Sequence, residues 1–154
     1  MGGPEPMRSG LVAVAVLTWV LITPAGVSGH RDATGIVKQR MDAMTSMGGA
    51  MKELGKMIRG TQHDDAERFK AYAGTIAQHG GDELTALFPE GSLNHPTRTL
   101  PSVWADWDHF VKLAQELERT AGSLASAVPA EREALFKRLR RTCADCHRSF
   151  RTKK

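Results

Sequence analysis

The sequence predicts an all-α protein, an antiparallel four-helix bundle, and three observations lead to that class. Four stretches repeat their apolar residues at intervals of three and four, which is the period of an amphipathic helix. Aromatic residues make up only 6% of the chain, and no run alternates β-branched and polar residues as a strand would. The helical stretches are joined by short connections apart from one loop, so we expect neighbouring helices to run antiparallel.

Residues 1–29 have the features of a secretory signal peptide. Arg8 supplies a positive charge, and a short uncharged apolar run over residues 11–22 follows it. Small residues then allow cleavage after Gly29 or, as a second option, after Ala25. The apolar run is shorter than the roughly 20 residues of a comfortable membrane span. We therefore expect cleavage and export to a bacterial periplasm, with retention as an N-terminal anchor as the alternative.

The rest of the chain, residues 30–154, is long enough for one compact domain and too short for two. Its formal charge is +4, because the signal contains one acid and one base that cancel. A balance this small does not suggest a nucleic-acid binder. After signal cleavage we expect no stable membrane insertion.

The first predicted helix runs from about residue 32 to residue 59, and Gly60 ends it. Arg40 interrupts its apolar stripe. The stripe consists of Ile36, Met44, Met47, Met51, Leu54 and Ile58. We expect this face to pack into the bundle.

The second predicted helix begins near Asp64 and Asp65, because acidic residues suit a first helical turn. Gly80 and Gly81 stop it, and a short helical piece over residues 82–87 is expected to follow. The inner side of the second helix carries Phe69, Tyr72, Ala73, Ile76 and Ala77.

Residues 88–101 hold three prolines and form the one long loop. Ser102 is a good N-cap for a third helix that is expected to reach Val128. Its stripe is the cleanest in the chain: Val103, Trp107, Phe110, Ala114, Leu117, Ala121, Leu124 and Val128. Pro129 then opens a fourth helix. Its inward residues are expected to be Leu135, Leu139, Thr142, Cys146 and Phe150.

The last predicted helix contains Cys143-Ala-Asp-Cys146-His147, the attachment pattern of a c-type haem. Two thiols add across the two vinyl groups of the porphyrin, and the imidazole that follows reaches the iron. On a helix these three residues stand at i, i+3 and i+4 and project from one face. The sequence therefore predicts one haem c, held through two thioethers, with His147 as the proximal ligand.

Two other uses of the cysteines, a redox disulfide and a zinc site, are open to this motif. A redox disulfide between Cys143 and Cys146 would be expected beside a βαβ pattern, which the sequence lacks. A zinc site with His147 would need a second Cys/His pair at normal spacing, and the chain contains no other cysteine. Both uses are therefore less favoured than haem attachment.

With its haem motif near the C-terminus, the chain resembles the class II cytochromes c, the cytochrome c′ family of haem-bearing four-helix bundles. The resemblance covers essentially all of the region after the signal. The first helix has Arg40-x-x-x-Met44 and then Met47-Gly48. The middle has Phe88-Pro-Glu-Gly and Leu100-Pro-x-x-Trp104-x-x-Trp107-x-x-Phe110, and the end has the haem motif followed by x-x-Phe150-Arg151.

The resemblance implies a role for each matching residue. Cys143 and Cys146 would form the thioethers, and His147 would be the fifth iron ligand. Arg40 matches a basic residue near the haem propionates, and Met44 matches the distal position above the sixth site. In low-spin relatives that methionine binds iron, whereas in cytochrome c′ proper the distal residue only packs over an open site.

Simpler readings of the two distal-side residues exist. A methionine on a buried stripe often only fills the core, and periodicity alone gives Met44, Met47 and Met51 similar claims. A charge within an apolar stripe is costly unless it is paired, so Arg40 needs a propionate, a neighbouring Asp or a route to solvent.

Nine basic residues gather around the haem motif against two acids over residues 132–154. Most of this charge is expected to be a solvated helix face. Because it surrounds the haem attachment site, it could also steer redox partner proteins that have acidic docking surfaces, and we expect Arg138, Arg141 and Lys153 to take part. The five histidines outside the motif, His30, His63, His79, His95 and His109, are expected on the surface.

The favoured function is that of a one-electron carrier and not an enzyme. The chain shows no catalytic serine motif, no paired inner carboxylates and no phosphate loop. If Met44 only packs over iron, the alternative is a protein that binds NO or CO in an apolar distal pocket. A peroxidase is disfavoured because the first helix offers no distal acid–base pair. The resemblance also allows a homodimer through the first two helices.

Overall fold

The computed structural model describes residues 1–3 and 33–153, and the helices lie in the second of these ranges. They are α1 (Gly35–Ile58), α2 (Ala66–Gln78), α3 (Gly81–Ala86), α4 (Ser102–Ala105), α5 (Trp107–Ala125) and α6 (Pro129–Phe150). In the described part of the chain no strand forms, and an isolated bridge pairs Thr99 with Arg151. From residue 4 onwards, the predicted signal segment lies outside the described residues.

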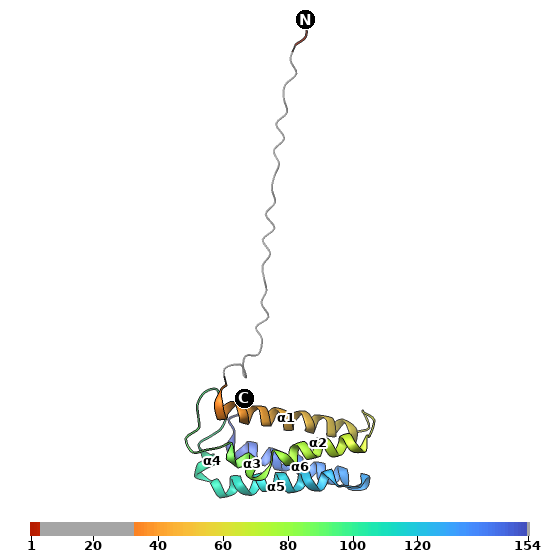
Figure 1. Ribbon diagram of the computed structural model, residues 1–154, viewed down its shortest axis with the longest axis vertical. Coiled ribbons are helices and arrows are strands. Elements are labelled where there is room, and N and C mark those ends of the chain that lie inside the picture. The colour runs from red at the N-terminus through yellow and green to blue at the C-terminus, as the bar shows by residue number, and fades with distance from the viewer. Residues whose placement is uncertain (4–32, 154) are drawn as a thin grey trace.

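The four long helices α1, α2, α5 and α6 lie along a common axis and alternate in direction, as Figure 1 shows. Consecutive long helices pack against each other, whereas α1 meets α6 at only a few points. The short helices α3 and α4 pack on α5 and lie beside the loop that crosses from the first helix pair to the second. The predicted antiparallel four-helix bundle is confirmed. In the described residues, no helix has the length and apolar character needed to cross a membrane.

The core forms where the apolar faces of the helices meet. Its fully buried large side chains are Phe69, Phe110, Leu54, Ile76, Leu124, Leu139 and Val103. Burying a residue of this size contributes roughly 1.5–3 kcal/mol, so this set accounts for much of the stabilisation by apolar burial. All seven occur in the predicted helical stretches. Among the described residues, the core also takes in side chains that were not expected on an inner face: Ala50, Met57, Leu84, Phe88 and Phe136.

The third predicted helix is wrong in its continuity and at both ends. Asp106, with φ −129° and ψ 53°, leaves the helical conformation and separates α4 from α5. Pro101 takes the N-cap position, and the Ser102 hydroxyl instead donates to the carbonyl of Ser149 at 2.8 Å. At the far end the helix stops at Ala125, and Val128, predicted to be on the stripe, is 56% exposed. The regular apolar spacing therefore extends beyond both ends of α5, into segments where the backbone is no longer part of that helix.

The buried face of α1 is offset from the predicted stripe. It consists of Val37, Arg40, Ala43, Met47, Ala50, Leu54, Gly55 and Met57. Ile36, Met44, Met51 and Ile58 are only partly buried, at the edge of this face. The buried face of α1 therefore includes small residues and an arginine, whereas the prediction had chosen the larger apolar residues beside them.

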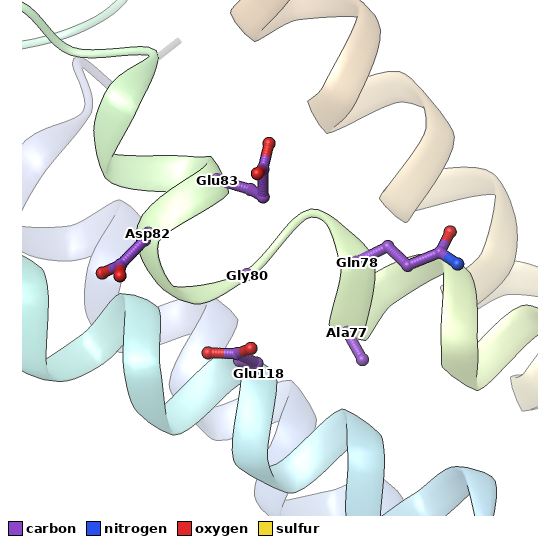
Figure 2. Close-up of a pocket in the computed structure, with 6 residues that line it drawn as sticks. All are labelled: Ala77, Gln78, Gly80, Asp82, Glu83 and Glu118. Atoms are coloured by element: carbon purple, nitrogen blue, oxygen red, sulfur yellow. The ribbon is translucent and has the colours of Figure 1, made fainter.

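The connection between α2 and α3 approaches α5 closely at Gly80 (Figure 2). A Cβ atom on Gly80 would lie 2.8 Å from the Cα of Glu118 and 2.8 Å from its backbone nitrogen. At Gly81 the backbone has φ +53°, a conformation that favours glycine. The two glycines thus stop α2 as predicted, and Gly80 also allows the chain to turn against α5.

Asp82, Glu83 and Glu118 line the shallow hollow beside this turn. Their carboxylates are spread around its rim in Figure 2. Over the described residues, no group of three or more His, Cys, Asp or Glu side chains is arranged to hold a metal ion. The hollow is therefore not a metal site by its own residues.

Candidate functional site

The haem motif occupies the last two turns of α6. Cys143 and Cys146 are free thiols, each half-buried against the core, and His147 is exposed at the rim of a surface groove. The helix extends without a break from Pro129 to Phe150, so the i, i+3 and i+4 spacing holds and the three side chains share a face. This is the arrangement that attachment through two adjacent vinyl groups requires.

The protonation states of the two thiols fit haem attachment better than a redox disulfide. Burial raises the pKa of the Cys143 thiol, and burial together with the neighbouring Cys143 raises the pKa of Cys146 to about 11. A reactive redox cysteine needs a lowered pKa instead. Partial desolvation of its ring, followed by the charges of Arg151 and Arg98, lowers the pKa of His147. The neutral imidazole, which is the form that binds iron, is thereby favoured.

Arg40 is buried in α1 and fastens the long loop to the bundle. Its Nη2 donates to the carbonyl of Ser92 at 2.6 Å, and its Nη1 donates to the Thr99 hydroxyl at 3.3 Å. The guanidinium carbon lies 4.7 Å from the centre of the Phe88 ring, a cation–π contact. Only 4% of the residue is exposed. The loop over residues 88–99 is therefore built around this one side chain.

The charge on Arg40 has no carboxylate partner among the described residues. Its buried Nε finds no hydrogen-bond partner in residues 33–153, and burial lowers the pKa of the guanidinium. A buried donor without a partner costs about 1–3 kcal/mol. A haem propionate would supply both the missing acceptor and the missing negative charge. No aspartate of the described residues pairs with Arg40, which was one of the partners expected from the sequence. The buried, unpaired guanidinium therefore fits a haem propionate.

The structure separates one of the three methionines, to which periodicity gave similar claims, from the other two. Met47 is 7% exposed and belongs to the core. Met44 and Met51 are only partly buried and pack against the edge of the core. Met44 follows Arg40 by one helical turn, as the sequence pattern requires. Core filling therefore accounts for Met47 but leaves Met44 available as a ligand.

An aromatic cluster joins the long loop and α5 to the end of α6 that carries the haem motif. The Phe110 ring lies 4.8 Å from that of Phe88 and 5.4 Å from that of Phe150, both edge to face. Trp104 donates its indole N–H to the carbonyl of Phe88 at 2.9 Å, and Trp107 packs on Phe110. Both tryptophans are partly buried and pack against the core.

The histidines outside the motif lie mostly where the sequence placed them. His63, His95 and His109 are exposed, although the His109 ring also packs 5.6 Å from that of Phe150. His79 is partly buried, so its expected surface position is wrong in degree. It caps α2 at the C-terminal end. His30 lies outside the described residues.

Sequence reasoning missed the residues that connect the loop to the end of α6. Thr99 pairs with Arg151 in an antiparallel bridge, and the amide of Leu100 donates to the carbonyl of Phe150 at 3.0 Å. The Thr152 amide donates to the carbonyl of Arg98 at 2.9 Å. No periodicity marks this contact, because residues more than 50 positions apart make it within two short irregular segments. It places Arg98 beside His147.

Comparison with known proteins gives one consistent result. The sequence model of the family described as Cytochrome C′ matches residues 35–151. The chain is 30% identical to cytochrome c-556 of Agrobacterium tumefaciens over 118 residues, which are 75% of this chain and 93% of that protein. It is 30% identical to cytochrome c′ of Rhodopseudomonas palustris over 126 residues, 79% of this chain and 84% of that protein. The crystal structure of a Rhodopseudomonas palustris cytochrome c′ superposes with a TM-score of 0.72 at 29% identity, covering 79% of this chain and 99% of the other.

Proposed function

Because the chain belongs to the cytochrome c′ family, and so carries one covalently bound c-type haem, we propose that it is a periplasmic one-electron carrier with His147 and Met44 as axial ligands. The haem supplies a single iron that alternates between the ferric and ferrous states. The chain's own residues attach it, fix its ligands and set its electrostatic surroundings. Cys143 and Cys146 form the thioethers, and Arg40 receives a propionate.

The observation that carries the carrier function is the position of Met44. It is half-buried beside the core, one helical turn from the buried Arg40, whereas the Met47 side chain is buried within the core. A thioether sulfur is a soft ligand that favours ferrous iron and keeps the coordination similar in both oxidation states. A carrier benefits from such constancy because little has to rearrange when the electron moves.

The alternative is binding of NO or CO at an open sixth site. Two relatives, from Rhodopseudomonas palustris and Halomonas halodenitrificans, bear the name cytochrome c′, which fits this alternative at least as well as electron transfer. Met44 would then only cover the iron. Its apolar surroundings would admit small neutral diatomics and exclude anions.

An optical spectrum of the wild-type protein and of Met44→Ala decides between the two functions. If Met44 is a ligand, both oxidation states of the wild type are low-spin, and CO binds slowly because the sulfur must first leave. Met44→Ala should then become high-spin, take up CO readily and have a lower reduction potential. Met51→Ala, another partly buried methionine of α1, is the matched control and should keep the wild-type spectrum. A high-spin wild type that Met44→Ala leaves unchanged would establish the gas-binding function.

Haem attachment is tested separately by extraction. With both thiols joined to the porphyrin, protein made in a host with haem-maturation machinery should keep its colour through acid–acetone treatment. Cys143→Ser should leave a single thioether and load less haem, and the Cys143→Ser/Cys146→Ser double variant should release all of its haem. Free extraction from the wild type would contradict covalent attachment.

A further inference from the structure

The structure divides the basic residues near the haem motif into neutralised and free ones. Four of them are paired with carboxylates: Arg132 with Asp64, Lys137 with Glu133, Arg138 with Glu116, and Arg148 with Asp145. Arg138 lies 2.6 Å from the Glu116 carboxylate, so its predicted part in steering is weakened. Within the described residues Arg151 and Lys153 form no ion pair.

Some of the free charges gather around His147. Arg140 and Arg141 are exposed and also form no ion pair among the described residues, but neither lines the surface beside His147, so the groove does not support the predicted part of Arg141 in steering. A surface groove of about 360 Å³ is lined by Arg98, His147, Arg148, Arg151, Thr152 and Lys153. Arg98 comes from the long loop and likewise has no ion pair in the described part of the chain. Arg98, Arg151 and Lys153 thus give the groove three positive charges that no carboxylate of the described residues neutralises. We call it the basic groove.

Backbone pairing holds two of these cations together. The Thr99–Arg151 bridge and the bond from the Thr152 amide to the Arg98 carbonyl fix the two segments side by side. The Arg98 guanidinium donates to the carbonyl of Thr152 at 2.6 Å, which holds it beside the segment that follows α6. Burial, followed by the charge of Arg98, lowers the pKa of Arg151. The fold therefore holds the positive charges of Arg98 and Arg151 close together, and an anion bound between them would reduce their repulsion.

We propose that the basic groove is the docking point of an acidic redox-partner protein, whose surface carboxylates bind to Arg98 and Arg151 beside His147. The inference rests on the proposed electron-carrier function and extends it to the place of contact. Guanidinium groups bind carboxylates through paired N–H donors, so they fix orientation as well as attract. The groove is open at the surface and lies next to the iron ligand, where a docked partner would come closest to the metal.

The test uses two charge-matched double variants of the haem-loaded protein. Arg151→Gln/Lys153→Gln removes two charges from the basic groove. Lys52→Gln/Lys70→Gln removes two from exposed positions, one in the second half of α1 and the other in the first half of α2. The connection between α1 and α2 lies at the end of the bundle opposite the C-terminus (Figure 1). Each ferrous protein is mixed with an acidic Cu(II) plastocyanin, and one electron passes from ferrous iron to copper, giving ferric iron and Cu(I). At low ionic strength we expect the groove variant to react about tenfold more slowly, the control less than about twofold, and the difference to vanish at high salt.

A binding measurement locates the contact independently of the reaction. Adding Cu(I) plastocyanin to isotope-labelled ferrous protein should shift the backbone amide signals of residues 98–100 and 148–153. The shifts should weaken in the groove variant and persist in the control. Signals that move instead around Lys52 and Lys70 would overturn the proposal.

Small reagents separate docking from other effects of the same charges. A groove variant slowed only with hexacyanoferrate(III), and not with plastocyanin, would make the groove a small-anion site and overturn the proposal. The groove variant could instead have a changed reduction potential, with its rates changed by the same factor for plastocyanin and for cationic tris(phenanthroline)cobalt(III). That result would mean that the charges act on the haem, and it would also overturn the proposal. A wild type that exchanges electrons slowly with all three reagents would refute the carrier function itself. Fast exchange with no groove effect would refute only the docking site.

Discussion

Gly80→Ala should lower the free energy of unfolding of the haem-loaded protein by about 3 kcal/mol, the upper range for forcing a methyl group into a packed contact. The added Cβ would lie 2.8 Å from the Cα and the backbone nitrogen of Glu118, and neither atom can swing aside as a side-chain end could. The α2–α3 connection would have to move away from α5 (Figure 2). Urea unfolding followed by circular dichroism measures the loss.

Gly122→Ala is the matched control for this change. Gly122 lies in α5 with nothing within 4 Å of the position that a Cβ would occupy. Alanine favours an exposed helix interior over glycine by roughly 0.5–1 kcal/mol, so this variant should be slightly more stable than the wild type. Equal stability of Gly80→Ala and Gly122→Ala would show that the close approach of the two helices is not a real constraint.

Arg40→Met is expected to cost about 3 kcal/mol of stability, because it leaves the carbonyl of Ser92 and the Thr99 hydroxyl without their donor. Methionine matches the length of the arginine stem, so the loss reflects the hydrogen bonds and charge more than the packing. Arg40→Lys keeps the charge and should lose less. Lys38→Met removes an exposed, ion-paired charge of the same helix and should change stability by no more than about 1 kcal/mol.

The reduction potential distinguishes the two roles assigned to Arg40. If the guanidinium receives a propionate, its removal takes a positive charge from the neighbourhood of the iron and lowers the potential. Arg40→Lys should then restore most of the wild-type value. A destabilised Arg40→Met protein with an unchanged potential would leave Arg40 as an anchor of the loop only.

The helices could be predicted because their large apolar residues recur at the helical period. The stretch from Pro129 onwards and the stop at Gly80 follow from local residue chemistry, which a sequence displays directly. The face of α1 was less predictable, since its buried positions include Arg40, Ala43 and Ala50. Small and charged residues become part of a core only when a neighbour fits against them, and that neighbour belongs to another segment.

The break between α4 and α5 at Asp106 could not be predicted either, because the pattern of apolar residues does not change there. Trp104 and Trp107 both remain on the inner side, one in α4 and the other in α5, so the apolar spacing continues while the backbone does not. In the same way the haem motif, a contiguous pattern, could be read from the sequence in full. Arg98 could not, because only the pairing of residues 98–100 with residues 150–152 brings it to His147.

That pairing has a consequence for how firmly His147, the proposed iron ligand, is held. The last turn of a helix ordinarily frays, with an opening free energy near zero. His147 lies close to the last turn of α6, yet the backbone beyond it is bonded to the loop through Leu100 and Thr152. The amides of these two residues should therefore exchange with deuterium slowly, unlike those of an ordinary helix end. The loop thus stabilises the last turn of α6, and His147 stays helical through contacts of the polypeptide itself.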